Sequence, residues 1–151
     1  MTLFRKLVFV VSALLFSGLA QAADGLIAVK SNHSVSDTTE RLVAALQDKG
    51  MMVMNRIDHA AGAGSVGAEL RPTEVVIFGN PKVGTPLMQC AQSVAVDLPQ
   101  KALIWEDNEG QVWLGYNDPA YLKVRHGIEG CDEVLAKVEA ALDNFASMAT
   151  R

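Results

Sequence analysis

Hydrophobic residues along the chain follow two different spacings. Short apolar runs occupy 26–30, 51–57, 75–78, 101–106 and 112–117, and turn-forming residues follow several of them, as expected of β-strands. Apolar residues recur every three or four positions over 35–46, around 85–92 and over 134–148, which indicates amphipathic helices. The small, glycine-rich stretch 60–69 predicts a loop or a weak helix.

The order strand, helix, strand, strand, helix, strand, strand, helix predicts an α+β fold. We expect a two-layer sandwich, in which one mixed or antiparallel sheet of about five strands carries helices on one face. The spacer 107–110 predicts a β-hairpin, which breaks a strict β-α-β alternation and makes a doubly wound sheet the second choice. The run 75–78 has no polar position, so we expect a central strand that is covered on both faces.

The first 22 residues have the layout of a secretory signal peptide. Arg5 and Lys6 precede an apolar run, and Ala20-Gln21-Ala22 supplies a cleavage site. An uncleaved anchor is the alternative, but a membrane-spanning helix needs about 20 apolar residues and this run is shorter. We therefore expect a single mature domain at 23–151 that has no membrane span and is periplasmic or secreted.

The net charge and the cysteine content limit which classes of partner and which cellular compartment are expected. The net charge is −4, and no cluster of Lys and Arg follows the leader, so nucleic acid is not expected as a partner. Cys90 and Cys131 can form one disulfide in an oxidising compartment. They do not form a Cys-x-x-Cys pair, and two separate thiols remain an equal alternative.

Three histidines fall at expected strand or helix ends, where side chains from different elements can meet. His33, His59 and His126, with Asp58 as a further donor, form a candidate transition-metal site, because neutral imidazole is a common metal ligand. Asn80, at the Gly79-Asn80-Pro81 corner after the central strand, completes the candidate ligand-binding residues. No two histidines have the i, i+4 spacing of a helical metal site, so solvated histidines are the alternative.

Motifs for cofactors and for covalent catalysis are weak. The segment 62–67 spells the dinucleotide fingerprint G-x-G-x-x-G, but Pro72 follows too soon for the helix that the motif requires, so no nucleotide is expected. No nucleophile elbow is present. An enzyme is therefore the less favoured interpretation; for a hydrolase or redox enzyme, the candidate general base is His59.

Several sequence blocks, in order, carry a resemblance to a known family. They are Ile57-Asp58-His59-Ala60-Ala61, Leu70-Arg71-Pro72-Thr73, Phe78-Gly79-Asn80-Pro81, Gly84-Thr85-Pro86-Leu87-Met88, Asp97-Leu98-Pro99, Trp105-Glu106-Asp107, Tyr116-Asn117-Asp118-Pro119 and Arg125-His126-Gly127. Together they resemble exported members of the domain of unknown function family 302. The resemblance implies a compact α+β domain whose relatives form dimers and are in some cases joined to other domains. Similar exported chains also carry histidine at the positions of His33, His59 and His126.

We therefore expect a small exported binding or accessory domain that forms a homodimer. Its ligand would be a metal ion or a small polar molecule held by the histidines. The two alternatives are an enzyme that uses His59 and a purely structural dimerising protein.

Overall fold

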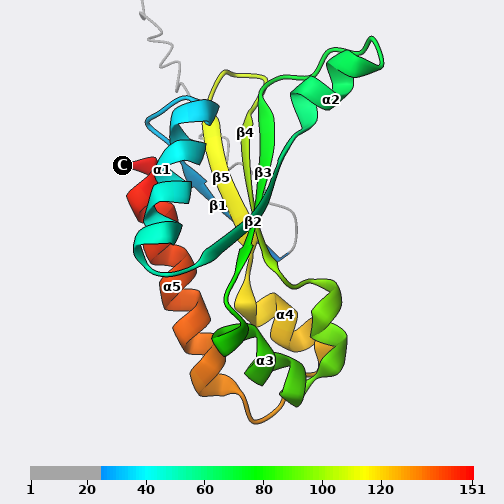
Figure 1. Ribbon diagram of the computed structural model, residues 1–151, viewed down its shortest axis with the longest axis vertical. Coiled ribbons are helices and arrows are strands. Elements are labelled where there is room, and N and C mark those ends of the chain that lie inside the picture. Colours follow the sequence, from blue (N-terminus) through cyan, green and yellow to red (C-terminus); the bar gives the residue numbers. More distant parts are fainter. Residues whose placement is uncertain (1–24) are drawn as a thin grey trace, which may run out of the picture.

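The computed structural model describes residues 25–151 and builds them around one five-stranded sheet (Figure 1). In chain order, the elements are β1 (Leu26–Lys30), α1 (Val35–Asp48), β2 (Met52–Asp58), α2 (His59–Ser65), β3 (Thr73–Gly79), α3 (Pro81–Cys90), the 3-10 helix η1 (Gln92–Val96), β4 (Gln100–Glu106), β5 (Val112–Asn117), α4 (Pro119–His126) and α5 (Asp132–Thr150). The strand order is β1-β5-β4-β3-β2, and every neighbouring pair is antiparallel. The predicted α+β sandwich is confirmed. The predicted leader, 1–22, lies outside the described residues.

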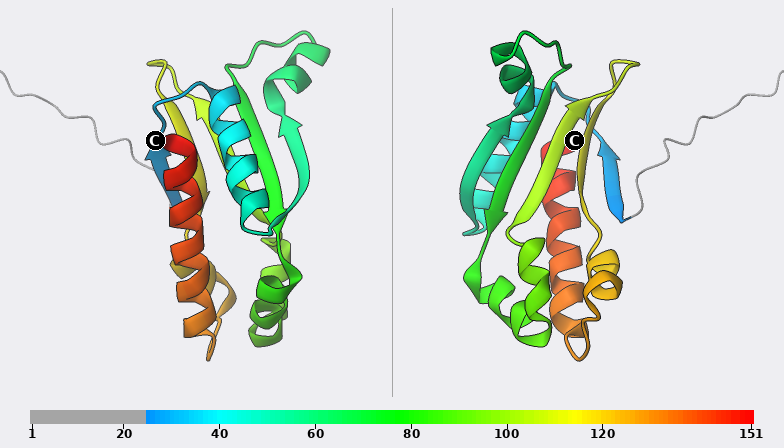
Figure 2. Two further views of the ribbon diagram at one scale, coloured as in Figure 1. Left: turned by 60° about the vertical axis from the view of Figure 1, so that its left-hand side comes forward. Right: turned by 90° about the vertical axis from the view of Figure 1, so that its right-hand side faces the viewer.

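The core lies between the sheet and the two long helices, α1 and α5, which cover the same face (Figure 2). Val76 and Phe78 of β3 point toward the helices, and so do Ala102 and Ile104 of β4, because side chains alternate between the two faces of a strand. The ring of Phe78 meets the ring of Phe145 of α5 edge to face, with centroids 6.3 Å apart. The buried faces of the strands and of the two long helices therefore form one continuous apolar core.

No described helix covers the opposite face of the sheet. The alternate side chains of the strands form this surface, which we call the outer sheet face: Ile57, Val75, Ile77, Leu103, Trp105 and Trp113. Trp105 and Trp113 stack there with centroids 6.4 Å apart. The prediction that strand 75–78 is covered on both faces is therefore wrong. Its apolar run supplies the core with two residues and the outer face with the other two, and β4 is the middle strand.

Three short helices, α3, η1 and α4, lie beyond the end of the sheet where β3 and β5 end (Figure 1). α3 begins before the predicted start near residue 85, because Asn80 caps it and Pro81 needs no N–H partner in the first turn. The hydrophobic pattern does not predict α4. Its ends nevertheless follow ordinary rules, since Asp118 caps its start and Gly127 adopts the left-handed conformation at its end.

α2 projects from the sandwich at the other end of the sheet (Figure 1). It is a short helix of small residues, and none of its side chains is buried. The stretch predicted as a loop or a weak helix is therefore a helix that makes little contact with the core. None of the helices within residues 25–151 is both long enough and apolar enough to cross a membrane.

Candidate functional site

The three histidines of the predicted metal site lie far apart in the fold. His33 follows β1 and His59 begins α2 after β2, so they lie at the same end of the sheet but on its two opposite edge strands. His126 ends α4, beyond the other end of the sheet. Within residues 25–151, no group of three His, Cys, Asp or Glu side chains is arranged to hold a metal ion. The structure therefore does not bring the three histidines together within one chain.

The other predicted site residues have local structural roles. Oδ1 of Asp58 accepts a hydrogen bond from a backbone N–H group of α2, and Oδ1 of Asn80 accepts one from a backbone N–H group of α3. The donor–acceptor distance is 2.9 Å in both. The ring Nε2 of His33 lies 3.0 Å from the backbone oxygen of Arg151 and donates to it. The His59 side chain is exposed. Of these four residues, Asn80 alone also borders the cleft described below.

His126 is the histidine with ordered side-chain partners on both ring nitrogens. Its Nε2 lies 2.6 Å from Oδ2 of Asp97 and donates to that carboxylate. Its Nδ1 lies 3.1 Å from Oγ of Ser93, an exposed residue of η1, and in the neutral ring it accepts from the hydroxyl. Arg125 Nη1 lies 3.5 Å from the other oxygen of Asp97. The sequence names His126 alone as a site residue: Asp97 is part of the resemblance block Asp97-Leu98-Pro99 without an assigned role, and Ser93 matches no motif.

A cleft of about 310 Å³ opens between α3 and α5, next to the end of β3 and the start of β4. We call it the α3–α5 cleft. Phe78 forms part of its floor, Leu87 and Met88 line the wall from α3, and Val138 and Ala141 line the wall from α5. Figure 2 shows these two helices on either side of the sheet end. The lining is mainly apolar, and its polar side chains are Asn80, Thr85, Gln100 and Lys137.

Methionines also contribute to this lining. Met51 and Met54 border the cleft near β2, and Met88 borders it from α3. Met51 and Met88 also pack against the core, whereas the Met54 side chain is exposed. Thioether side chains are flexible and polarisable, so this wall can adapt to the shape of a bound molecule.

Gln100 places a buried polar group in the apolar lining. It begins β4 opposite Phe78, on the helix-facing side of the sheet, and is 7% exposed. Its side-chain oxygen, Oε1, has no hydrogen-bond partner within the described residues. Buried polar groups in folded proteins are nearly always paired, so an unpaired one beside a cleft marks a place where a ligand can bind. No sequence motif marks Gln100, and only the packing around it reveals the missing partner.

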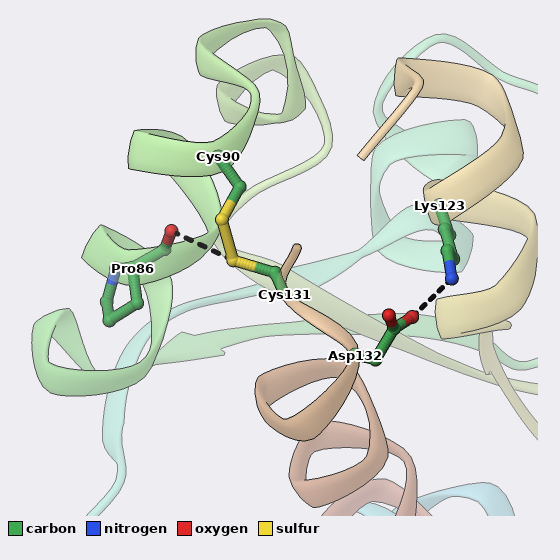
Figure 3. Close-up of a disulfide and its surroundings, with 5 residues drawn as sticks. All are labelled: Pro86, Cys90, Lys123, Cys131 and Asp132. Carbon is green, nitrogen blue, oxygen red and sulfur yellow. Dashed lines mark hydrogen bonds and ion pairs between the residues drawn. A yellow bond between two sulfur atoms is a disulfide. The ribbon is translucent and has the colours of Figure 1, made fainter. Parts of the chain in front are cut away.

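A disulfide ties the two walls of the cleft together. Cys90 is the last residue of α3 and Cys131 directly precedes α5, and the structure joins them with Cα atoms 6.4 Å apart (Figure 3). The sequence left this pairing open. Sγ of Cys131 also lies 3.6 Å from the carbonyl oxygen of Pro86, in a contact without a donated proton, since a disulfide sulfur carries none. Next to the disulfide, Asp132 and Lys123 form an ion pair that links α5 to α4.

One shifted pKa belongs to a neighbour of the cleft: the hydrogen bond from Lys137, which lines the cleft, lowers the pKa of Glu133 on the exposed surface of α5. The other shifted pKa values occur away from the cleft. Trp113 Nε1 donates to Oδ2 of Asp107 over 2.8 Å, and this hydrogen bond lowers the pKa of that carboxyl. Ion pairs with Glu74 and Glu40 raise the pKa of Arg56 on β2. Burial raises the pKa of Tyr116. These groups stabilise turns and strands, and they give no acid or base to the α3–α5 cleft.

Known proteins resemble the chain in both sequence and fold. It is 50% identical over 113 residues to "Fluoride-specific ion channel FluC 1" of Brucella suis biovar 1 (strain 1330), which is 75% of this chain and 44% of that protein. "Fluoride-specific ion channel FluC 2" of Brucella melitensis biotype 1 (strain ATCC 23456 / CCUG 17765 / NCTC 10094 / 16M) is also 50% identical over 113 residues, with 42% of that protein covered. The chain thus spans less than half the length of these curated relatives.

The fold also matches a solved structure. The "Crystal structure of uncharacterized conserved protein DUF302 from Bacillus stearothermophilus" superposes with a TM-score of 0.75 at 21% sequence identity, covering 85% of this chain and 100% of that one. At this identity the match shows the fold alone. In sequence, the family model "Domain of unknown function DUF302" matches residues 27–145, which is most of the chain. The chain belongs to the DUF302 family.

Proposed function

We propose that this chain is a binding domain, not an enzyme, and that the α3–α5 cleft holds its ligand. The observation that carries this proposal is the cleft itself. Its volume of about 310 Å³ is at the lower end of the range for small-molecule sites, about 300–1,000 Å³, and a mainly apolar lining with a few polar groups is typical of such sites. The histidines do not border the cleft, so we propose a mainly apolar ligand in place of the metal ion or small polar molecule expected from the sequence.

Two features support export to the periplasm or beyond. Residues 1–22 carry the pattern of a signal peptide. The Cys90–Cys131 disulfide is of a kind that persists in oxidising compartments and is rare in the cytosol. We therefore place the proposed binding function outside the cytoplasm.

An accessory role is supported by the proteins that the chain resembles. Their name describes a fluoride-specific ion channel, but the matching segment is less than half of each protein. We propose that this segment is a separate binding domain in those proteins and that the present chain performs the same role. Ion conduction is not part of the proposal, because an apolar cleft offers a small hydrated anion no compensation for its lost water.

We further propose that two copies of the chain associate through the outer sheet face. The half-buried side chains of Ile77, Leu103 and Trp105 are part of an apolar surface that no described helix covers. Contiguous apolar surface of this kind is favourable to bury against another protein. Dimerisation and ligand binding use different faces, so each can be tested without disturbing the other.

The binding proposal is tested with an uncharged naphthylamine dye whose fluorescence rises in apolar surroundings. Ala141→Leu adds a larger side chain to the α5 wall and takes up space that the dye needs, so it should weaken dye binding roughly tenfold, which corresponds to about 1.4 kcal/mol. Ala140→Leu is the matched control, because Ala140 is exposed on the same helix but outside the lining. Absence of dye binding, or equal binding by the two variants, would reject the cleft as the site. Elemental analysis of the protein adds a check, since a stoichiometric transition metal would favour the metal site.

A hydrolase remains the second candidate, because Ser93, His126 and Asp97 form a hydroxyl–imidazole–carboxylate chain. In this arrangement His126 is the general base, whereas the sequence pointed to His59. Ser93→Ala should abolish any hydrolysis of p-nitrophenyl acetate by the purified protein, and Ser65→Ala on the projecting α2 is the control. Equal rates for both variants and the unmodified protein would exclude this function.

A further inference from the structure

We infer that the ligand of the α3–α5 cleft is a neutral, mainly apolar molecule with one O–H or N–H donor, and that Gln100 accepts a hydrogen bond from that donor. The inference rests on the proposed binding function and names the ligand class. The evidence is the side-chain amide of Gln100, which borders the cleft, is 7% exposed, and leaves Oε1 without a partner in the described residues. The amide thus places one buried, unpaired acceptor at a mainly apolar lining.

The location of this acceptor distinguishes it from other polar groups of the fold. Thr39 Oγ1 is the other buried side-chain oxygen without a partner in residues 25–151, and it lies on α1, outside the cleft lining. Asn80 does border the cleft, but its amide already caps α3 and donates to the backbone oxygen of Gly50. Gln100 is therefore the buried group at the cleft that can accept a hydrogen bond from a donor on a ligand.

The charges around the cleft favour a neutral ligand. Lys137 is the ionisable side chain in the lining, and its Nζ lies 2.7 Å from Oε1 of Glu133 on the exposed surface of α5. A carboxylate placed beside Gln100 would lose its water, and the one cation of the lining, Lys137, is already paired with Glu133, so a charged ligand is unfavourable there. An ammonium group would meet an amide oxygen but no carboxylate. A hydroxyl or a neutral N–H needs only the single acceptor that Gln100 provides.

The volume of the cleft sets the size of the molecule. An apolar cavity of about 150 Å³ holds one benzene ring. The α3–α5 cleft, at about 310 Å³, therefore has room for two fused rings or an aliphatic chain of similar bulk. Phenols, aryl alcohols and medium-chain alcohols all combine this size with one donor.

Three probes of nearly equal shape test the inference on the unmodified protein. 2-Naphthol has the donor, 2-methoxynaphthalene lacks it, and 2-naphthoate replaces it with a charge. Affinities are measured by displacement of the naphthylamine dye. We expect 2-naphthol to bind about tenfold more tightly than either of the others, because a probe without the donor leaves the buried acceptor unpaired.

Gln100→Met provides the matched variant, since methionine is also unbranched and of similar length but has no amide. It should reduce the preference for 2-naphthol over 2-methoxynaphthalene to about twofold or less while retaining affinity for the latter. Equal binding of the three probes to the unmodified protein, or a preference for 2-naphthol that survives Gln100→Met, would overturn the inference. If the probes bind equally but Ala141→Leu excludes them, the binding function stands and the donor recognition fails. If no probe binds, the binding function itself fails.

Discussion

Removal of the Cys90–Cys131 disulfide should lower the free energy of unfolding by about 4 kcal/mol. The two cysteines are separated by 41 positions in the sequence. In the chain-entropy model, closing a loop of that size removes about 13 cal/mol/K of entropy from the unfolded chain, which is about 4 kcal/mol at 25 °C. Small domains have a total stability of about 5–15 kcal/mol, so this one bond accounts for a large share.

The measurement is urea unfolding of the double variant Cys90→Ala, Cys131→Ala, followed by tryptophan fluorescence. With a slope of about 2 kcal/mol per molar urea, the midpoint should fall by about 2 M. The unmodified protein in excess reductant is the control and should unfold near the same midpoint as the double variant. Intact-mass analysis before and after reduction establishes that the bond is present at the start. Coincident midpoints for the oxidised protein and the double variant would refute the reasoning.

The same variant should also weaken the cleft. α3 has one buried residue, Leu87, so few apolar contacts hold this wall when the disulfide is absent. Cys90 joins the end of α3 to the residue before α5, and α5 forms the opposite wall. We therefore expect reduced affinity for the naphthylamine dye under conditions in which the double variant is still folded. Unchanged affinity would show that the packing of α3 alone keeps the cleft in shape.

Two further predictions concern other parts of the fold. Asp107→Asn should destabilise the protein at neutral pH, because the carboxylate accepts from Trp113 Nε1 and from two backbone N–H groups. The folded-state pKa of Asp107 is lowered, so its stabilising effect exists above its ordinary value of 3.8 and is lost as the pH falls through the folded value. The difference in urea midpoint between the two proteins should therefore shrink on acidification, and a constant difference would contradict this. Ile77→Lys on the outer sheet face should convert a dimer to a monomer in sedimentation analysis, with Lys82→Ala on α3 as a control, and an unchanged sedimentation coefficient would reject that interface.

Most of the fold could be predicted from the sequence because short apolar runs mark the strands and apolar residues at helical spacing mark the long helices. Val112, Leu114 and Tyr116 of β5 are buried on the helix-facing side, and the residues between them are turned to the other face, as the geometry of a strand requires. α4 could not be found in this way, because it lies beyond the sheet end and has only two buried residues, Pro119 and Leu122. Its Asp-Pro start and glycine end were the available signals.

The candidate site was harder to predict, since it depends on how distant elements pack. His33 and His59 were correctly assigned to element ends, but the strand order puts β1 and β2 on opposite edges of the sheet and separates them. Gln100 is one polar residue at the start of a strand, and nothing in its sequence neighbourhood distinguishes it. Its side chain lacks a partner because α3 and α5 surround it with apolar groups, and this can be read only from the assembled structure.

The position of β1 affects the order in which the chain can fold. β2, β3 and β4 each pair with the next strand along the chain, so the four strands β2 to β5 can form a meander before β1 joins them. β1 pairs with β5 alone, which brings Leu26 against Asn117. Although β1 is synthesised before the other strands, it has no pairing partner until β5 has been synthesised and has joined the sheet. The first strand of the domain is therefore the last to join the sheet, and until it does, one edge of β5 stays open to pairing with other extended chains.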